Sequence, residues 1–112
     1  MITKELVAAT TQPIVLSVLA HGDDYAYSII RKVKQISGGE LEWTEGMLYP
    51  VLHRMEKEKL LAARWDSTDV GRPRRYYRLT KAGRRALVQN QSQWKAMHET
   101  FTKLWGPKTC FS

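Results

Sequence analysis

A basic segment from Gly71 to Arg85 constrains the fold of this chain more than any other stretch. It holds seven basic side chains and no acidic one: Arg72, Arg74, Arg75, Arg78, Lys81, Arg84 and Arg85. The other residues carry eleven basic and eleven acidic side chains, so this segment accounts for the formal net charge of +7. Tyr76, Tyr77 and Leu79 lie among the arginines, which a solvated basic tail would not require. We expect one arm of a β-hairpin that packs by its apolar side and offers guanidinium groups to phosphates.

The composition suits one domain with an appended element and indicates an anionic partner. The chain has 112 residues, of which 43% are hydrophobic, enough for a modest core. The sequence pI of about 9.8 favours nucleic acid as the partner, with an anionic membrane surface second. Cys110 is the only cysteine and cannot form an internal disulfide, and no long apolar run follows Met1. We therefore expect no membrane span, no cofactor and a cytoplasmic location.

Two helices are expected in the first third of the chain. Apolar residues recur at helical spacing between Leu6 and Ala20. Pro13 interrupts this pattern, and either lies in the first turn of a helix that starts there or kinks an earlier helix. A second helix is predicted from Tyr25 to about Ile36, with Asp23 and Asp24 as candidate N-caps.

A third helix is expected to begin after Thr44, whose hydroxyl suits an N-cap. The alternating residues from Leu41 to Trp43 could form a very short strand before it. Inside the helix, Leu48 and the apolar residues that follow at helical spacing would face the core. Pro50 conflicts with this pattern, because a proline inside a helix costs about 3 kcal/mol. Either another contact compensates or the first turn is irregular.

A β-hairpin is predicted from two stretches that alternate in polarity. They run from Leu60 to Trp65 and from Arg74 to Leu79, on either side of a turn-rich segment. In the first stretch, Trp65 shares one face with Leu61 and Ala63. In the second stretch, Tyr77 and Leu79 are expected to pack inward, because alternate residues of a half-buried strand face the core.

A long helix is predicted to close the chain, from Lys81 to about Trp105, with Thr80 as its N-cap. It carries a seam of residues at steps of three and four with one polar position: Leu87, Asn90, Trp94, Met97, Phe101 and Leu104. The apolar members are too many to be left exposed. We expect Leu87, Trp94, Met97, Phe101 and Leu104 to form the interface of a homodimer.

Three helices followed by a hairpin with a basic tip is the element order of a winged helix-turn-helix. The predicted fold class is therefore α+β, mostly helical, with an added C-terminal dimerisation helix. Residues 1–80 would form the DNA-binding domain, and residues 81–112 the dimerisation helix and tail. The third helix can enter a major groove while the hairpin reaches the flanking backbone or minor groove. The plainer alternative is an ordinary core helix beside a solvated hairpin.

Several motifs occur in a fixed order between Leu6 and Gly83. They are Leu48-Tyr49-Pro50, His53-Arg54-Met55-Glu56, Leu60-Leu61 and Gly71-Arg72-Pro73-Arg74-Arg75-Tyr76-Tyr77-Arg78-Leu79-Thr80-Lys81-Ala82-Gly83. Together they resemble the PadR family of bacterial transcriptional regulators. The resemblance accounts for Pro50, since a proline there belongs to the family's pattern. Met47 and the pair Glu58-Lys59 depart from that pattern, and Met47 bears on base preference.

The resemblance implies a homodimeric repressor that binds an inverted repeat in double-stranded DNA. The residues that match the family's recognition-helix face are Thr44, Gly46, Tyr49, Pro50 and Arg54, and those that match its wing are Arg72, Arg74 and Arg75. The single C-terminal helix looks like the small subfamily, in which some members bind multiple drugs against a tryptophan at the dimer interface. Trp94 matches that tryptophan, which implies a planar aromatic effector. The alternative is that Trp94 only packs in the interface.

Other function classes fit the residues less well. His21, His53 and His98 are scattered, and no catalytic set accompanies them, so we do not expect an enzyme. A membrane-surface helix needs basic residues along its polar face, and the last helix has few beyond Arg85. A non-regulatory nucleic-acid-binding protein, architectural or RNA-associated, stays open as an alternative. Preference for one duplex over random DNA would separate a regulator from that alternative.

Overall fold

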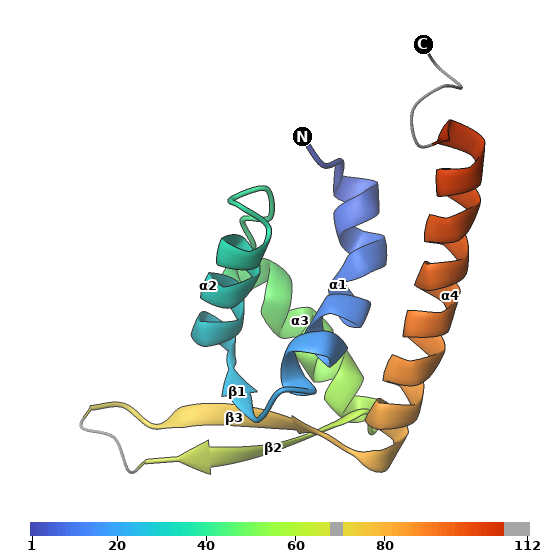
Figure 1. Ribbon diagram of the computed structural model, residues 1–112. Coiled ribbons are helices and arrows are strands. Elements are labelled where there is room, and N and C mark those ends of the chain that lie inside the picture. Colours follow the sequence, from blue (N-terminus) through green and yellow to red (C-terminus); the bar gives the residue numbers. More distant parts are fainter. Residues whose placement is uncertain (68–70, 107–112) are drawn as a thin grey trace.

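The computed structural model describes residues 1–67 and 71–106. In chain order its elements are α1 (Lys4–Leu19), β1 (Asp24–Tyr25), α2 (Ala26–Ile36), α3 (Glu45–Lys57), β2 (Leu61–Asp66), β3 (Arg74–Leu79) and α4 (Lys81–Trp105). Figure 1 shows α1, α2 and α3 gathered above the strands, with the β2–β3 hairpin extending to one side and α4 rising on the other. The mostly helical α+β fold with a winged-helix arrangement is confirmed. Cys110 and part of the predicted turn before Gly71 lie outside the described residues.

α1 is one helix that runs through Pro13, so the alternative in which a helix begins at Pro13 is wrong. Its N-cap is Thr3, whose hydroxyl oxygen accepts a hydrogen bond from the Leu6 amide at 3.2 Å. The face that meets the other helices includes Val15 and Leu16, both 0% exposed. The apolar half of α1 is therefore central to the core.

The predicted capping of α2 by Asp23 or Asp24 is wrong. Asp24 lies in β1, opposite Tyr77 of β3, and its carboxylate accepts a hydrogen bond from Lys32 Nζ at 2.7 Å. The N-cap position belongs to Tyr25, which makes no side-chain cap. Pairing with a strand far along the chain thus holds this segment extended, and it overrides the local capping signal.

The segment before α3 does not form the predicted short strand: residues 41–43 have no regular secondary structure. Trp43 is instead 6% exposed and belongs to the hydrophobic core, so burial of its indole fixes the segment. α3 begins as predicted, with Thr44 Oγ1 accepting a hydrogen bond from the Met47 amide at 3.2 Å. Pro50 lies inside α3 at an exposed position, and the helix continues on both sides of it.

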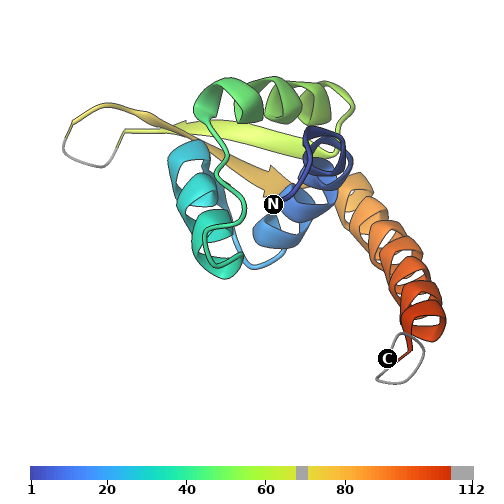
Figure 2. The ribbon, with the colours of Figure 1, turned by 90° about the horizontal axis from the view of Figure 1, so that it is seen from above.

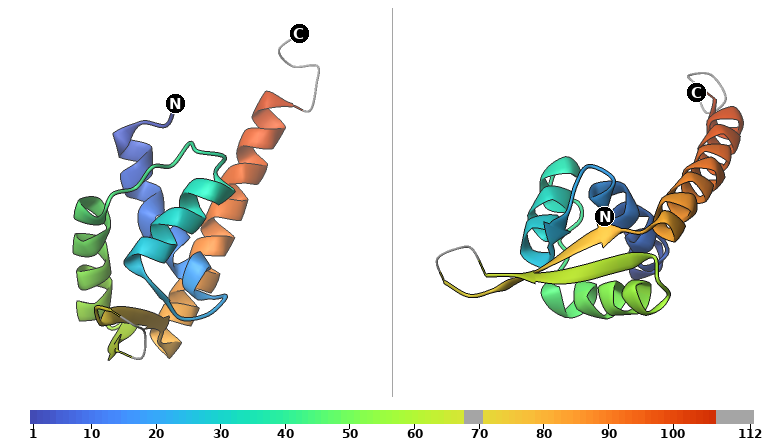
Figure 3. Two further views of the ribbon diagram at one scale, coloured as in Figure 1. Left: turned by 90° about the vertical axis from the view of Figure 1, so that its left-hand side faces the viewer. Right: turned by 90° about the horizontal axis from the view of Figure 1, so that it is seen from below.

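The sheet has the strand order β1-β3-β2, and both pairings are antiparallel. Its register places Leu61 opposite Leu79 and Ala63 opposite Tyr77. Tyr77 and Leu79 are 0% and 4% exposed, which confirms that they pack inward. Trp65, by contrast, is 65% exposed. Figure 3 shows the outer part of the hairpin projecting past the helices.

The start of α4 is tied closely to the rest of the chain. Thr80 Oγ1 accepts a hydrogen bond from the Gly83 amide at 3.0 Å and donates one to the Lys59 carbonyl at 2.6 Å. A side chain at Gly83 would collide with the Leu60 carbonyl, so this contact requires glycine. Leu87, at 8% exposure, also packs in the core of its own chain.

The outer part of α4 leaves the body of the molecule. Every residue from 91 to 105 is exposed, and Figure 2 shows this part of the helix pointing away from the hairpin. The radius of gyration is 16.3 Å, whereas a compact chain of this length would have about 13 Å. The wing and the outer half of α4 are thus two projections from one small core.

Candidate nucleic-acid interface

An open groove lies between the outer face of α3, the start of α2 and the wing, which we define as β2, β3 and the described residues between them. We call it the wing groove. Its volume is about 810 Å³, and its lining includes Tyr25, Tyr27, Glu45, Tyr49, His53, Trp65 and Arg72–Arg75. Aromatic rings and guanidinium groups therefore predominate over the single carboxylate. Such a lining suits a phosphate backbone, which guanidinium groups bind with charge-assisted hydrogen bonds.

α3 contributes an exposed face to this surface. Tyr49 is 36% exposed, and its ring centroid lies 6.1 Å from that of His53, one turn further along. Gly46 and Pro50 of α3 and its N-cap residue Thr44 are also exposed, but they do not line the groove. Because the partial positive charge of a helix N-terminus favours anions, this end of α3 can approach a polyanion.

Guanidinium groups along the wing are held over aromatic rings. The guanidinium carbon of Arg74 lies 4.5 Å from the ring centroid of Tyr25, and that of Arg64 lies 5.1 Å from the ring centroid of Tyr76. The Tyr25 and Tyr76 rings meet edge to face at 5.2 Å. Arg64 also forms an ion pair with Asp23 at 2.6 Å. The stacking limits the freedom of these long side chains, so fewer conformations are lost when an anion binds.

Arg75 is engaged differently, with residues of its own chain on the inward side of the wing. Its Nη2 lies 2.8 Å from Glu56 Oε2 of α3, and its guanidinium carbon lies 5.4 Å from the ring centroid of Trp65. The hydrogen bond to Glu56 raises the pKa of Arg75, and burial opposes the rise. The side chain is only 28% exposed, which distinguishes it from Arg72, an exposed residue of the same groove.

Arg54 does not line the wing groove. It lines a separate hollow of about 530 Å³ between α1 and α4, together with Pro13, Trp94 and Met97. A second hollow of about 210 Å³ lies on another side of Trp94. Of the predicted DNA-binding and ligand-binding residues, Tyr49, Arg72, Arg74 and Arg75 therefore line the wing groove, and Arg54 and Trp94 line the hollow between α1 and α4. Thr44, Gly46 and Pro50 line neither.

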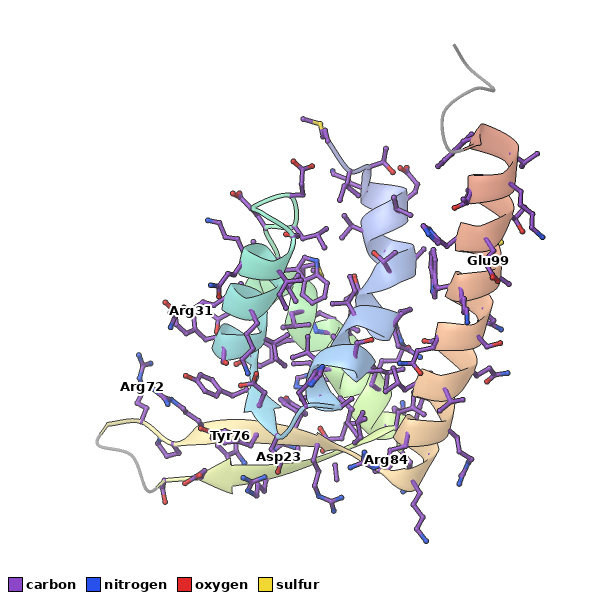
Figure 4. All side chains as sticks on the ribbon, viewed as in Figure 1. Asp23, Arg31, Arg72, Tyr76, Arg84 and Glu99 are labelled. Atoms are coloured by element: carbon purple, nitrogen blue, oxygen red, sulfur yellow. The ribbon has the colours of Figure 1, made fainter. Side chains whose placement is uncertain are left out.

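Sequence patterns did not point to Tyr27, a residue at the start of α2 that lines the groove. Tyr27 is 56% exposed, and the guanidinium carbon of Arg31 lies 5.8 Å from its ring centroid. Figure 4 places Arg31 and Arg72 along the same edge of the molecule. The spacing of four residues between Tyr27 and Arg31 on one helix was the available signal, since such pairs are neighbours on a helix surface.

The part of the chain that the structure describes lacks two further features. Residues 1–67 and 71–106 contain no group of three or more His, Cys, Asp or Glu residues placed to hold a metal ion. No helix in the same ranges is long and apolar enough to cross a bilayer.

Three helices, a basic wing and the groove between them define a winged-helix DNA-binding protein. The sequence model of the transcriptional regulator PadR-like family matches residues 15–89. The chain belongs to this family of regulators, which are not enzymes.

Individual relatives agree with this assignment. Transcriptional regulator Rv3488 of Mycobacterium tuberculosis is 34% identical over 91 residues, which cover 81% of this chain and 81% of that protein. A PadR family transcriptional regulator from Eggerthella lenta has a solved structure with a TM-score of 0.73 and 33% identity, covering 93% of this chain and 85% of that chain. A transcriptional regulator from Clostridium thermocellum has a TM-score of 0.82 over 92% of this chain and 97% of that chain; at 24% identity it supports the fold alone.

Proposed function

We propose that the chain is a ligand-responsive repressor that binds an inverted repeat in double-stranded DNA as a homodimer. The observation that carries the proposal is the wing groove, where the exposed face of α3 and the arginines of the wing line one surface. Thr44, Gly46, Tyr49 and Pro50 would face base edges in the major groove, and Arg72 and Arg74 would bind phosphates beside it.

The exposed face of α4 supports the homodimer. Five large apolar side chains beyond the core are between 39% and 64% exposed: Trp94, Met97, Phe101, Leu104 and Trp105. Phe101 and Trp105 stack at 4.8 Å, which makes part of this face a continuous aromatic surface. A second copy of the same helix would cover it, as apolar faces of this kind require. Leu87, predicted for the same interface, is already packed within its own chain.

A twofold dimer implies the form of the operator. Two recognition helices related by a twofold axis enter successive major grooves of one duplex. The half-sites would therefore be inverted repeats with centres about 10 bp, or a multiple of that, apart. The wings would lie on the flanking phosphates and add affinity that falls as salt is raised.

The hollows beside Trp94 support an effector site. Trp94 is 40% exposed and lines both the hollow of about 530 Å³ and that of about 210 Å³. An exposed indole beside open space can stack on a planar aromatic molecule. Arg54 is the charged residue among those that line the larger hollow. Its charge favours a neutral or anionic aromatic effector over a cationic one, because like charges repel in a partly desolvated site.

Selection of binding sites from a random duplex pool with the full chain tests the proposal. A regulator should recover an inverted repeat and bind it about a thousandfold or more tightly than random DNA. Equal affinity for all duplexes would contradict the repressor and support a non-regulatory nucleic-acid-binding protein. Addition of a planar aromatic molecule that binds at Trp94 should then change the affinity for the selected duplex, since coupling between sites acts in both directions.

A further inference from the structure

Arg75 connects the two elements that the proposed function brings to DNA. It belongs to β3 of the wing, and its partner Glu56 belongs to the last turn of α3. The two side chains are 28% and 31% exposed, and Nη2 of Arg75 lies 2.8 Å from Oε2 of Glu56. This ion pair joins α3 to the wing.

The strand pattern explains why Arg75 reaches α3 while its neighbour does not. Successive residues of a strand point to opposite faces. Arg75 therefore shares the inward face of β3 with Tyr77, which is 0% exposed, whereas Arg74 lies on the other face, over Tyr25. Of the two adjacent arginines, Arg75 is the one directed toward the recognition helix.

Two aromatic rings complete the surroundings of the Arg75 guanidinium. Its carbon lies 5.4 Å from the ring centroid of Trp65 on β2 and 5.9 Å from that of Tyr77. The Tyr77 hydroxyl is buried without a hydrogen-bond partner in the described part of the chain. Burial raises the pKa of Tyr77, and the positive charge of Arg75 partly offsets the rise. Arg75 thus contacts β2, β3 and α3 at the point where the hairpin leaves the helices.

We infer that Arg75 is a positioning residue, which together with Glu56 sets the wing at a fixed angle to α3, rather than a phosphate ligand. The sequence pattern predicts a phosphate contact for Arg75, as for Arg72 and Arg74. A guanidinium already paired with a carboxylate gains less from a phosphate, because the ion pair must first be broken. A wing held at one angle, in contrast, lets Arg72 and Tyr49 reach the same duplex together. This inference rests on the proposed binding of DNA.

The two roles predict opposite changes in DNA affinity for the variant Glu56→Gln. If Arg75 were a phosphate ligand, removal of the competing carboxylate would free it, and affinity for DNA would rise. If Arg75 positions the wing, the loss of the ion pair lets the wing move, and affinity for the duplex selected by the wild-type protein should fall by roughly tenfold. Glu58→Gln is the matched control, because Glu58 is a neighbouring exposed acid with no ion pair among the described residues. It removes the same charge from the same end of α3.

A charge exchange provides the second test. Arg75→Glu alone should weaken binding of the selected duplex, whichever role is correct. Arg75→Glu combined with Glu56→Arg restores an ion pair between α3 and the wing, so the positioning role predicts that most of the affinity returns. A phosphate ligand would not be restored, because the new carboxylate on the wing repels the backbone. Glu56→Arg alone serves as the control for the added positive charge.

Salt dependence and hydrogen exchange separate this inference from the proposed function. Arg75→Ala should leave the slope of log affinity against log salt unchanged, whereas loss of a phosphate contact lowers its magnitude by about 0.9 per subunit. In the protein without DNA, the β3 amides should exchange faster in Glu56→Gln than in Glu58→Gln. A lowered slope in Arg75→Ala, or a rise in affinity in Glu56→Gln, would overturn the positioning role. If the wild-type protein prefers no duplex, both the proposed function and the role of Arg75 in DNA binding are wrong.

If the β3 amides exchange at the same rate in Glu56→Gln and in Glu58→Gln, the contact between Arg75 and Glu56 does not hold the wing. That result would refute the positioning role and leave the proposed function intact.

Discussion

The wing and the outer half of α4 both project from the same core, but they differ in what holds them. The arginines of the wing stack on tyrosines, and one pairs with α3, so the wing is supported by its own chain. The outer half of α4 has apolar side chains that are exposed over residues 91–105. Charged side chains are well solvated, so the wing is stable in water without a partner. An exposed apolar face is instead stabilised when another surface buries it. This difference supports the proposal that the wing binds DNA and the outer half of α4 binds a second subunit.

Removal of the outer half of α4 should have the largest effect. A chain that ends after Asn90 keeps Leu87 in the core, so it should fold, but it loses the exposed apolar face. We expect a monomer in sedimentation, with affinity for an inverted repeat lowered by about a hundredfold or more, since two linked half-sites no longer bind together. A chain that ends at Gly106 retains all of α4 and is the control. A stable dimer of the shorter chain would show that another surface joins the subunits.

Trp94→Ala should remove effector binding while it leaves the subunits together. A fully buried tryptophan costs about 3–5 kcal/mol on truncation. Trp94 is 40% exposed in the single chain, so its loss should cost the single chain less. Fluorescence titration with ethidium and with a pyrene sulfonate compares a cationic and an anionic planar probe, and the charge of Arg54 predicts tighter binding of the sulfonate.

Two results would contradict the proposed effector site at Trp94. If the variant dissociates into monomers, Trp94 is mainly a packing residue of the interface. If neither probe quenches the wild-type fluorescence in a saturable way, the planar aromatic effector is wrong. Trp43, Trp65 and Trp105 also contribute fluorescence, so the variant is needed as the reference.

Arg72→Ala, a change in the wing, should lower the affinity for DNA by a smaller amount and equally for all duplexes. Its side chain lines the wing groove at an exposed position. We expect weaker binding of all duplexes alike, and a salt slope reduced in magnitude by about 0.9 per subunit, because phosphates carry no sequence information. Arg84→Ala removes the same charge from the start of α4, away from the groove, and should leave the slope nearly unchanged (Figure 4). Equal salt slopes in the two variants would show that Arg72 does not contact a phosphate.

Tyr77→Phe should have the smallest effect, at the root of the wing. The Tyr77 hydroxyl is buried and has no hydrogen-bond partner among the described residues, so its removal should stabilise the fold by about 1 kcal/mol or leave it unchanged. Because the pKa of Tyr77 is raised in the folded chain, its hydroxyl ionises in the unfolded chain before it does in the folded chain as the pH rises past about 10. The free energy of unfolding should therefore fall above that pH in the wild type, and less in the variant.

Urea unfolding at pH 7 and at pH 10.5 measures both effects. Tyr27→Phe, at a residue 56% exposed, is the control. A strong loss of stability in Tyr77→Phe at pH 7 would mean that the hydroxyl has a partner after all.

Local signals predicted much of the fold from sequence. Thr44 and Thr80 cap α3 and α4 as expected, and the hairpin alternation placed Tyr77 and Leu79 inward. These predictions succeeded because each depends on residues a few positions apart. The prediction for Asp24 failed because β1 pairs with β3, a contact that no local pattern encodes.

The candidate site was harder to predict than the fold. The arginines of the wing were found from their charge, but sequence alone did not distinguish Arg75, whose neighbour Glu56 is nineteen residues away. The same limit applies to Arg54, which shares a helix with Tyr49 but lines the hollow beside Trp94. Which hollow a side chain lines depends on how the helices pack, and packing is decided by contacts distant in the chain.

The stoichiometry and preference of the complex with DNA test the central claim most directly. The full chain would be titrated against a duplex selected from a random pool and against a scrambled duplex of the same composition, and the mass of each complex measured by sedimentation. We predict two chains on each selected duplex, half-sites about 10 bp or a multiple apart, and a preference of about a thousandfold over the scrambled duplex. One chain per duplex, or equal affinity for both duplexes, would contradict a dimeric sequence-specific regulator.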